Sequence, residues 1–145
     1  EYGCPVILMH NRQGREYKNL LSGIVADLRE SIAIAHRAGI RDEQIILDPG
    51  IGFAKTYEDN LSAMNVLAPL TWLGYPVLLG TSRKSMIRLT LDLPAHDVIE
   101  GTAATVAYGI AQGCAIVRVH DVKAMKRVAA LTDAMVRAKG GGWHG

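Results

Sequence analysis

Four short apolar runs, each followed by a segment with helical periodicity, constrain the fold of this chain more than any other feature. Each run is about as long as a β-strand, and none alternates cleanly between apolar and polar residues, which is typical of strands buried on both faces of a parallel sheet. The runs are residues 5–9 (PVILM), 44–48 (QIILD), 76–80 (PVLLG) and 115–119 (AIVRV).

Helices are expected after these runs, from the spacing of apolar residues and from the glycines that follow. Residues 18–38 carry apolar side chains at intervals of three and four, and Gly39 then supplies a helix terminator. Further helices are expected over residues 58–70, 97–112 and 122–139, with a shorter one near 84–91. Three consecutive glycines, residues 140–142, are expected to close the last helix.

The order of these elements predicts an α/β protein of four βα units with parallel strands. Such units suit the right-handed crossover that joins neighbouring parallel strands. Both a doubly wound open sheet and a (β/α)8 barrel are built from them. A complete barrel needs about 250 residues, whereas the chain has 145, so it accounts for half a barrel at most.

Composition and charge exclude several classes of protein. The chain is 49% hydrophobic and 21% charged, as expected of a folded domain. Its net charge of +2 gives no electrostatic basis for a nucleic-acid partner, and no apolar run approaches the roughly 20 residues that span a bilayer. Cys4 and Cys114 flank apolar runs, so we expect buried free thiols rather than a disulfide, which fits a reducing cytoplasm, and their spacing does not indicate a zinc site. Glu1 leaves open an upstream targeting segment.

Polar and glycine-rich stretches follow each predicted strand, whereas the strand starts are plain. In a barrel, the carboxyl ends of the strands carry the functional residues. The stretches are residues 10–12 (HNR), 48–55 (DPGIGFAK), 80–85 (GTSRKS) and 118–121 (RVHD). For residues 10–12, a short polar loop tip is an adequate explanation. The other three predict a ligand site.

Asp48 is costly at the end of an apolar strand unless its carboxylate is paired or faces a ligand with hydrogen-bond donors. Its two oxygens suit a fork of two N–H groups on a planar heterocycle. Gly50 and Gly52 then allow a ligand to approach the backbone. The alternative is that Asp48 caps the next turn, and the sequence leaves both interpretations open.

The stretch after the third strand and the end of the fourth each indicate binding of an anion. Residues 81–85 (TSRKS) join two cations to three hydroxyls, which suits an anion or a polar ring, although a solvated basic turn explains them equally. Arg118 and His120 project to the same side of their strand because the side-chain period is two. The pair suits phosphate or diphosphate, unless Arg118 is paired with a carboxylate.

Three sequence motifs at these strand ends, in this order, resemble those of the bacterial dihydropteroate synthases. They are LDPGIGF at residues 47–53, TSRKS at 81–85 and RVHDV at 118–122, and LMHNR at 8–12 is closest to the Gram-positive type. The resemblance covers essentially the whole chain, from the fifth barrel strand onward. It implies half of a (β/α)8 TIM barrel and a single C-terminal (βα)4 portion over residues 1–145.

The resemblance also implies a reaction in folate biosynthesis. The amine of p-aminobenzoate attacks the exocyclic methylene of 6-hydroxymethyl-7,8-dihydropterin diphosphate, and diphosphate leaves. The family is the target of sulfonamides and is typically homodimeric. It uses Mg²⁺, whose ligands are expected in the other half of the barrel and not in this segment.

The resemblance assigns roles to eight residues. Those implied in catalysis are Lys84, Arg118 and His120. The pterin is expected to contact Asp48, Lys84, Arg118, Met9, Phe53 and Gly80. The diphosphate is expected at Arg118 and His120, and p-aminobenzoate at Ser85 and Lys84. Ser82 and Arg83 are expected to support the loop.

Two departures from the family pattern and two alternative functions remain. Arg88 stands where the family usually has a glycine, which is expected to alter the turn after the third strand. The first four barrel strands are not in this sequence, so we expect the chain alone to be a poor catalyst that needs the other half, a swapped partner or a longer parent chain. The alternatives are a pterin-dependent methyltransferase and a catalytically silent half-barrel that serves in assembly.

Overall fold

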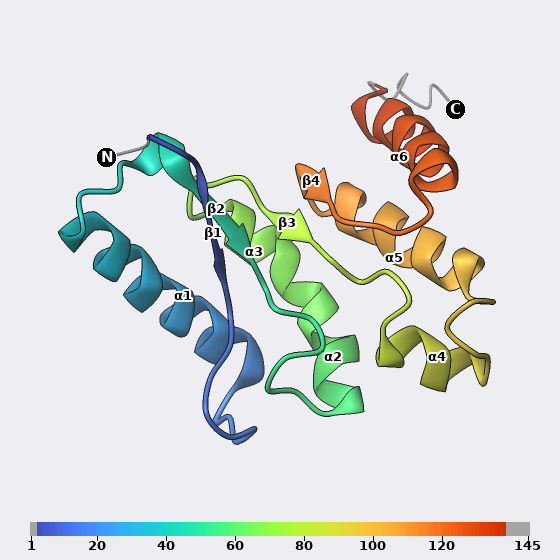
Figure 1. Ribbon diagram of the computed structural model, residues 1–145, viewed down its shortest axis with the longest axis horizontal. Coiled ribbons are helices and arrows are strands. Elements are labelled where there is room, and N and C mark those ends of the chain that lie inside the picture. The colour runs from blue at the N-terminus through green and yellow to red at the C-terminus, as the bar shows by residue number, and fades with distance from the viewer. Residues whose placement is uncertain (1–2, 139–145) are drawn as a thin grey trace, which may run out of the picture.

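The structure, a computed structural model, describes residues 3–138. They form four parallel strands with helices packed along one side (Figure 1). The strands are β1 (Val6–Met9), β2 (Ile45–Asp48), β3 (Leu78–Leu79) and β4 (Ile116–Val117). β1 pairs with β2 and β3 with β4, both in parallel, and a parallel bridge between Leu47 and Val77 joins the two pairs. The strands therefore lie side by side in chain order, and the predicted (βα)4 arrangement is confirmed.

The helices are close to their predicted positions. They are α1 (Leu20–Arg37), α2 (Tyr57–Ala63), α3 (Leu67–Thr71), α4 (Ser85–Leu91), α5 (Ile99–Ala111) and α6 (Val122–Arg137), with a 3₁₀ turn η1 (Asp42–Gln44) before β2. The side chain of Asn19 caps α1 by accepting a hydrogen bond from the Ser22 backbone N–H. The predicted end of the last helix at Lys139 and its glycine tail lie outside the described residues.

One predicted helix is broken. Instead of a continuous helix over residues 58–70, the chain forms α2, a 3₁₀ turn η2 (Met64–Val66) and α3. Pro69 lacks the N–H that a continuous helix needs to bond the carbonyl of Asn65, so the turn tightens before it. Leu61, within α2, is 42% exposed, whereas Leu67 and Leu70 of α3 are fully buried.

The hydrophobic core lies between the strands and the helices. Residues with less than 2% exposure include Ile24 and Leu28 of α1, Ile45, Leu47 and Leu79 of the strands, and Leu67 and Leu70 of α3; Val106 of α5 and Met125 of α6 are each 1% exposed. The opposite face of β1 is open, since Ile7 is 53% exposed and Met9 38%. The expectation of burial on both faces is therefore wrong for β1, because no other described element packs on that face.

The parallel direction of the strands places the loops that follow them at one edge of the molecule. Arg88 lies inside α4 and is exposed, rather than in the turn that follows β3. Cys114 is buried as expected, whereas Cys4 is exposed, because it precedes β1 at the margin of the core. No helix within residues 3–138 has the length and apolar character needed to cross a bilayer.

Candidate functional site

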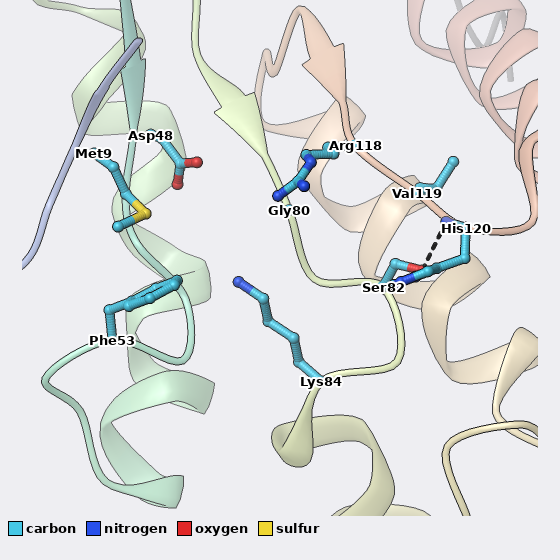
Figure 2. Close-up of a pocket in the computed structure, with 9 residues that line it drawn as sticks. All are labelled: Met9, Asp48, Phe53, Gly80, Ser82, Lys84, Arg118, Val119 and His120. Atoms are coloured by element: carbon cyan, nitrogen blue, oxygen red, sulfur yellow. Dashed lines mark hydrogen bonds between the residues drawn. The ribbon is translucent and has the colours of Figure 1, made fainter.

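A cavity with a volume of about 240 Å³ opens where the four strands end (Figure 2). It is lined by Met9, Asp48, Phe53, Gly80, Ser82, Lys84, Arg118, Val119 and His120. Seven of the eight residues singled out in the sequence are in this set. Ser85 is not, because it begins α4 with its side chain exposed. Residues from four loops far apart in the chain therefore surround one space.

Asp48 ends β2 and faces the cavity, and one of its carboxylate oxygens is hydrogen-bonded within the loop that follows. Its Oδ1 accepts a hydrogen bond of 2.8 Å from the backbone N–H of Gly50. The turn-capping interpretation is therefore correct for one oxygen, while no hydrogen bond reaches Oδ2 from any residue of the described range 3–138. Burial raises the pKa of Asp48, and the N–H of Gly50 and the cation of Lys84 act in the opposite direction.

The loop after β2 can take its shape only with glycine at position 50. Gly50 has a φ of +69°, a conformation that side chains with a Cβ rarely adopt. A Cβ built on Gly50 would lie 1.9 Å from the carbonyl oxygen of His10. The loop thus packs directly on the backbone that follows β1, and Phe53 from this loop lines the cavity (Figure 2).

Lys84 reaches into the cavity from the loop after β3. Its Nζ donates a hydrogen bond to the carbonyl of Ile51 and lies 5.1 Å from the centroid of the Phe53 ring. Burial lowers the pKa of Lys84, whereas the charge of Asp48 raises it. The alternative of a solvated basic turn is therefore wrong, since Lys84 is directed inward and Ser82 is only 7% exposed.

Arg118 and His120 form the opposite wall of the cavity, after β4 (Figure 2). The backbone N–H of Arg118 donates to the carbonyl of Leu79, which continues the β3–β4 pairing by one residue. Within residues 3–138, the Arg118 side chain forms no ion pair. Arg118 and Lys84 together outweigh the single carboxylate of Asp48, so the wall of the cavity is positive and suits an anion.

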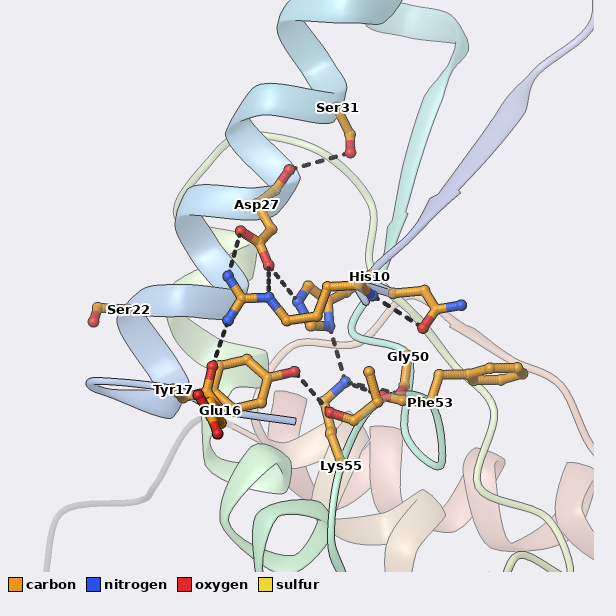
Figure 3. Close-up of polar contacts among 12 residues, drawn as sticks. His10, Glu16, Tyr17, Ser22, Asp27, Ser31, Gly50, Phe53 and Lys55 are labelled. Carbon is orange, nitrogen blue, oxygen red and sulfur yellow. Dashed lines mark hydrogen bonds and ion pairs between the residues drawn. The ribbon is translucent and has the colours of Figure 1, made fainter. Parts of the chain in front are cut away.

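A buried polar network behind the cavity was not predicted (Figure 3). Lys55, which is 4% exposed, donates to the carbonyls of Gly50 and Phe53 at 3.0 and 2.9 Å and contacts Nδ1 of His10 at 2.9 Å. Nε2 of His10 lies 2.9 Å from Asp27. The interpretation of residues 10–12 as a polar loop tip is therefore wrong for His10, which is 2% exposed, whereas Asn11 is exposed.

The network supports the loop that carries Phe53. Arg12 also pairs with Asp27, at 3.1 Å, and its guanidinium stacks on the ring of Tyr17. The hydroxyl of Tyr17 in turn donates to the carbonyl of Ala54. No local signal identifies these contacts, since the partners of His10 lie 17 and 45 residues away in the chain.

Residues 3–138 do not hold a cluster of metal-ligand side chains by themselves. Across the described part of the chain, no three His, Cys, Asp or Glu side chains lie close enough together to hold a metal ion. The chemistry of the cavity is that of one carboxylate, two cations, an imidazole and an aromatic ring.

The sequence of this chain matches a known family of enzymes over most of its length. Residues 1–120 match the family of pterin-binding enzymes. The chain belongs to this family. The curated relatives of this pterin-binding chain are dihydropteroate synthases. The resemblance inferred from the three sequence motifs is thereby confirmed.

Two of these relatives are dihydropteroate synthases of Gram-positive genera. The chain is 57% identical over 145 residues to the enzyme of Bacillus subtilis and 59% identical over 138 residues to that of Clostridium beijerinckii. These alignments cover 100% and 94% of this chain but only 50% and 51% of the relatives. The pterin-binding chain thus spans about half the length of the relatives it matches.

Solved structures agree with the fold. A Clostridium difficile dihydropteroate synthase, solved in the presence of pteroic acid, superposes with a TM-score of 0.90 at 44% identity, over 92% of this chain and 51% of the other. The Yersinia pestis enzyme in a sulfonamide drug complex gives 0.90 at 33% identity, over 94% and 53%. The pterin-binding chain is therefore half of a (β/α)8 barrel, as predicted.

Proposed function

We propose that this chain forms the part of a dihydropteroate synthase that holds the pterin and the departing diphosphate. The observation that supports the proposal most directly is the convergence of seven residues, predicted from separate strand ends, on one cavity. In this reaction, the amine of p-aminobenzoate forms a C–N bond to the methylene of 6-hydroxymethyl-7,8-dihydropterin diphosphate. The C–O bond breaks, diphosphate departs with the electron pair, and the amine loses a proton.

Asp48 and Lys84 are the proposed pterin contacts. The free Oδ2 of Asp48 accepts from the N–H groups on the guanidine-like edge of the pterin, while Oδ1 is held by Gly50. Because loss of diphosphate leaves positive charge on the pterin methylene, the carboxylate also stabilises that charge. Met9, Phe53 and Gly80 line the cavity around the ring.

Arg118 and His120 are the proposed diphosphate site. Negative charge accumulates on the leaving oxygens as the C–O bond breaks, and the guanidinium and the imidazole N–H stabilise it. Lys84 adds a second cation between the two substrates. The proposal needs no nucleophilic side chain, since electrostatic stabilisation and positioning are sufficient.

The site of p-aminobenzoate is proposed at Ser85 and Lys84. Ser85 begins α4 at the rim of the cavity rather than inside it. Its exposed hydroxyl is accessible to a carboxylate that projects out of the pterin pocket. The aniline nitrogen then lies toward Lys84, closer to the reacting methylene.

Three further properties complete the proposal. The enzyme acts in the cytoplasm as a homodimer on two small-molecule substrates. Mg²⁺ is proposed to take part, with ligands from the other half of the barrel. Size-exclusion chromatography with light scattering tests the dimer.

Ligand titration tests the pterin site. Calorimetric titration of the chain with 6-hydroxymethylpterin is expected to show binding that the Asp48→Asn variant weakens by about tenfold or more, since a hydrogen bond to a charged group contributes about 1.5–3 kcal/mol. Asp133→Asn on the exposed face of α6 is the matched control and leaves binding unchanged. Equal affinity in wild type and Asp48→Asn contradicts the assignment.

Product formation separates the proposed function from its alternatives. The chain alone is expected to release little diphosphate from the two substrates, and addition of the N-terminal half of the Bacillus subtilis relative is expected to increase the rate. A methyltransferase would bind pterin without affinity for diphosphate. A silent assembly module would bind neither ligand. Robust turnover by the chain alone would refute the expectation that it is incomplete.

A further inference from the structure

Ser82 and His120 make two contacts that together specify where the protons lie. Ser82 is in the loop after β3, and His120 is 38 residues later, after β4. The backbone N–H of His120 donates to Oγ of Ser82 at 3.1 Å. The same Oγ lies 2.8 Å from the ring Nδ1 of His120 (Figure 2).

A serine hydroxyl has one proton to donate, and the described residues offer it one acceptor within hydrogen-bond distance. Oγ of Ser82 already accepts the backbone N–H of His120, and its other hydrogen-bond partner within residues 3–138 is Nδ1 of the same residue. If Nδ1 carried the ring proton, the hydroxyl hydrogen of this 7% exposed serine would have no acceptor among residues 3–138. The hydroxyl therefore donates to Nδ1, and the neutral ring carries its proton on Nε2.

We propose that Ser82 is a positioning residue that holds neutral His120 in the Nε2–H tautomer, so that the ring presents an N–H donor to an anion in the cavity. The use of that donor for diphosphate rests on the proposed function. The tautomer itself rests only on the two contacts. An uncharged imidazole in this state binds an anion that the opposite tautomer, with a lone pair on Nε2, would repel.

An ion pair beside Ser82 holds the two loops together independently of the serine hydroxyl, so the effect of Ser82 on the tautomer can be tested apart from its effect on the loops. Arg83 pairs with Asp121 at 3.0 Å, so the loops after β3 and β4 stay tied when the Ser82 hydroxyl is removed. The Ser82→Ala variant is therefore expected to fold. The Arg83→Gln variant, in contrast, weakens the tie between the loops and leaves the hydroxyl in place.

Nitrogen NMR reads the tautomer directly. In the chain labelled with ¹⁵N-histidine at about pH 8, where free imidazole is neutral, His120 is assigned by its loss in His120→Gln. The chain has five histidines, so the spectrum contains few signals. The signals of His10 serve as an internal reference for chemical shifts, because the Ser82 variants do not change its surroundings. Wild type and Arg83→Gln are expected to show Nε2–H at His120, whereas Ser82→Ala shows a mixture of tautomers. Ser82→Thr, which keeps the hydroxyl, restores the wild-type state.

Calorimetric titration with inorganic diphosphate gives the second readout. Ser82→Ala is expected to weaken binding about threefold to tenfold, the effect of one neutral hydrogen bond, and Ser82→Thr to recover it. Nδ1–H in wild type, or an unchanged tautomer in Ser82→Ala, overturns the proposal. If wild type shows the expected tautomer but does not bind diphosphate, the proposed function fails while the positioning role stands.

Discussion

Replacement of Lys55 with methionine is expected to remove a rise in stability with pH that the buried ammonium causes. Burial, the largest effect, lowers the pKa of Lys55 from 10.5 to about 8, and the charges of Asp48 and Asp59 oppose that shift. The methionine side chain has a similar length and no charge. The difference between the two proteins therefore isolates the titration of one amine.

The sign and size of the effect follow from proton binding in the two states. Between pH 8 and 10.5 the unfolded chain holds the Lys55 proton and the folded chain does not, so the free energy of unfolding rises with pH in this interval. Each pH unit corresponds to about 1.4 kcal/mol, which gives a total rise of about 3 kcal/mol. This contribution is complete above pH 10.5 and is lost as the pH falls through 8.

Urea unfolding of both proteins across this pH range measures the effect. The subtraction is needed because the titration of Cys114 overlaps this range and has the opposite sign, since burial raises the pKa of that thiol from 9.0 to about 12. Lys126→Met, on the exposed surface of α6, is the matched control and should parallel wild type. A difference between wild type and Lys55→Met that stays constant, or falls, between pH 8 and 10.5 would refute the reasoning.

Three further changes test the site and its supports. Gly50→Ala is expected to lower the free energy of unfolding by about 3 kcal/mol or more. The control is Gly39→Ala, at a φ of +82° with no atom within 4 Å of the added Cβ, which is expected to cost about 1–2 kcal/mol. Equal urea midpoints for the two variants would contradict this. Asp27→Ala removes the partner of His10 and is expected to cost about 1–3 kcal/mol in urea unfolding. Arg118→Met is expected to weaken diphosphate binding and flatten its salt dependence in calorimetric titrations, and an unchanged slope would exclude a direct charge contact.

The sequence by itself determined the elements and the residues that enter the site. Strand and helix positions follow from interactions within a few residues, such as the period of apolar side chains and the cap at Asn19. Parallel βα units place every strand's carboxyl end at one edge. Asp48, Lys84 and Arg118 were therefore predictable as neighbours even though 36 and 34 residues separate them in turn.

Only the tertiary structure decided which polar groups are buried and how they are paired. The burial of a side chain depends on what packs over it, and that comes from distant parts of the chain. Lys55 meets His10 across 45 residues, and Ser82 meets His120 across 38, so no local pattern contains either contact. For Asp48, the bond from Gly50 to Oδ1 is local, but the cavity that the side chain faces is formed by residues from the other strand ends.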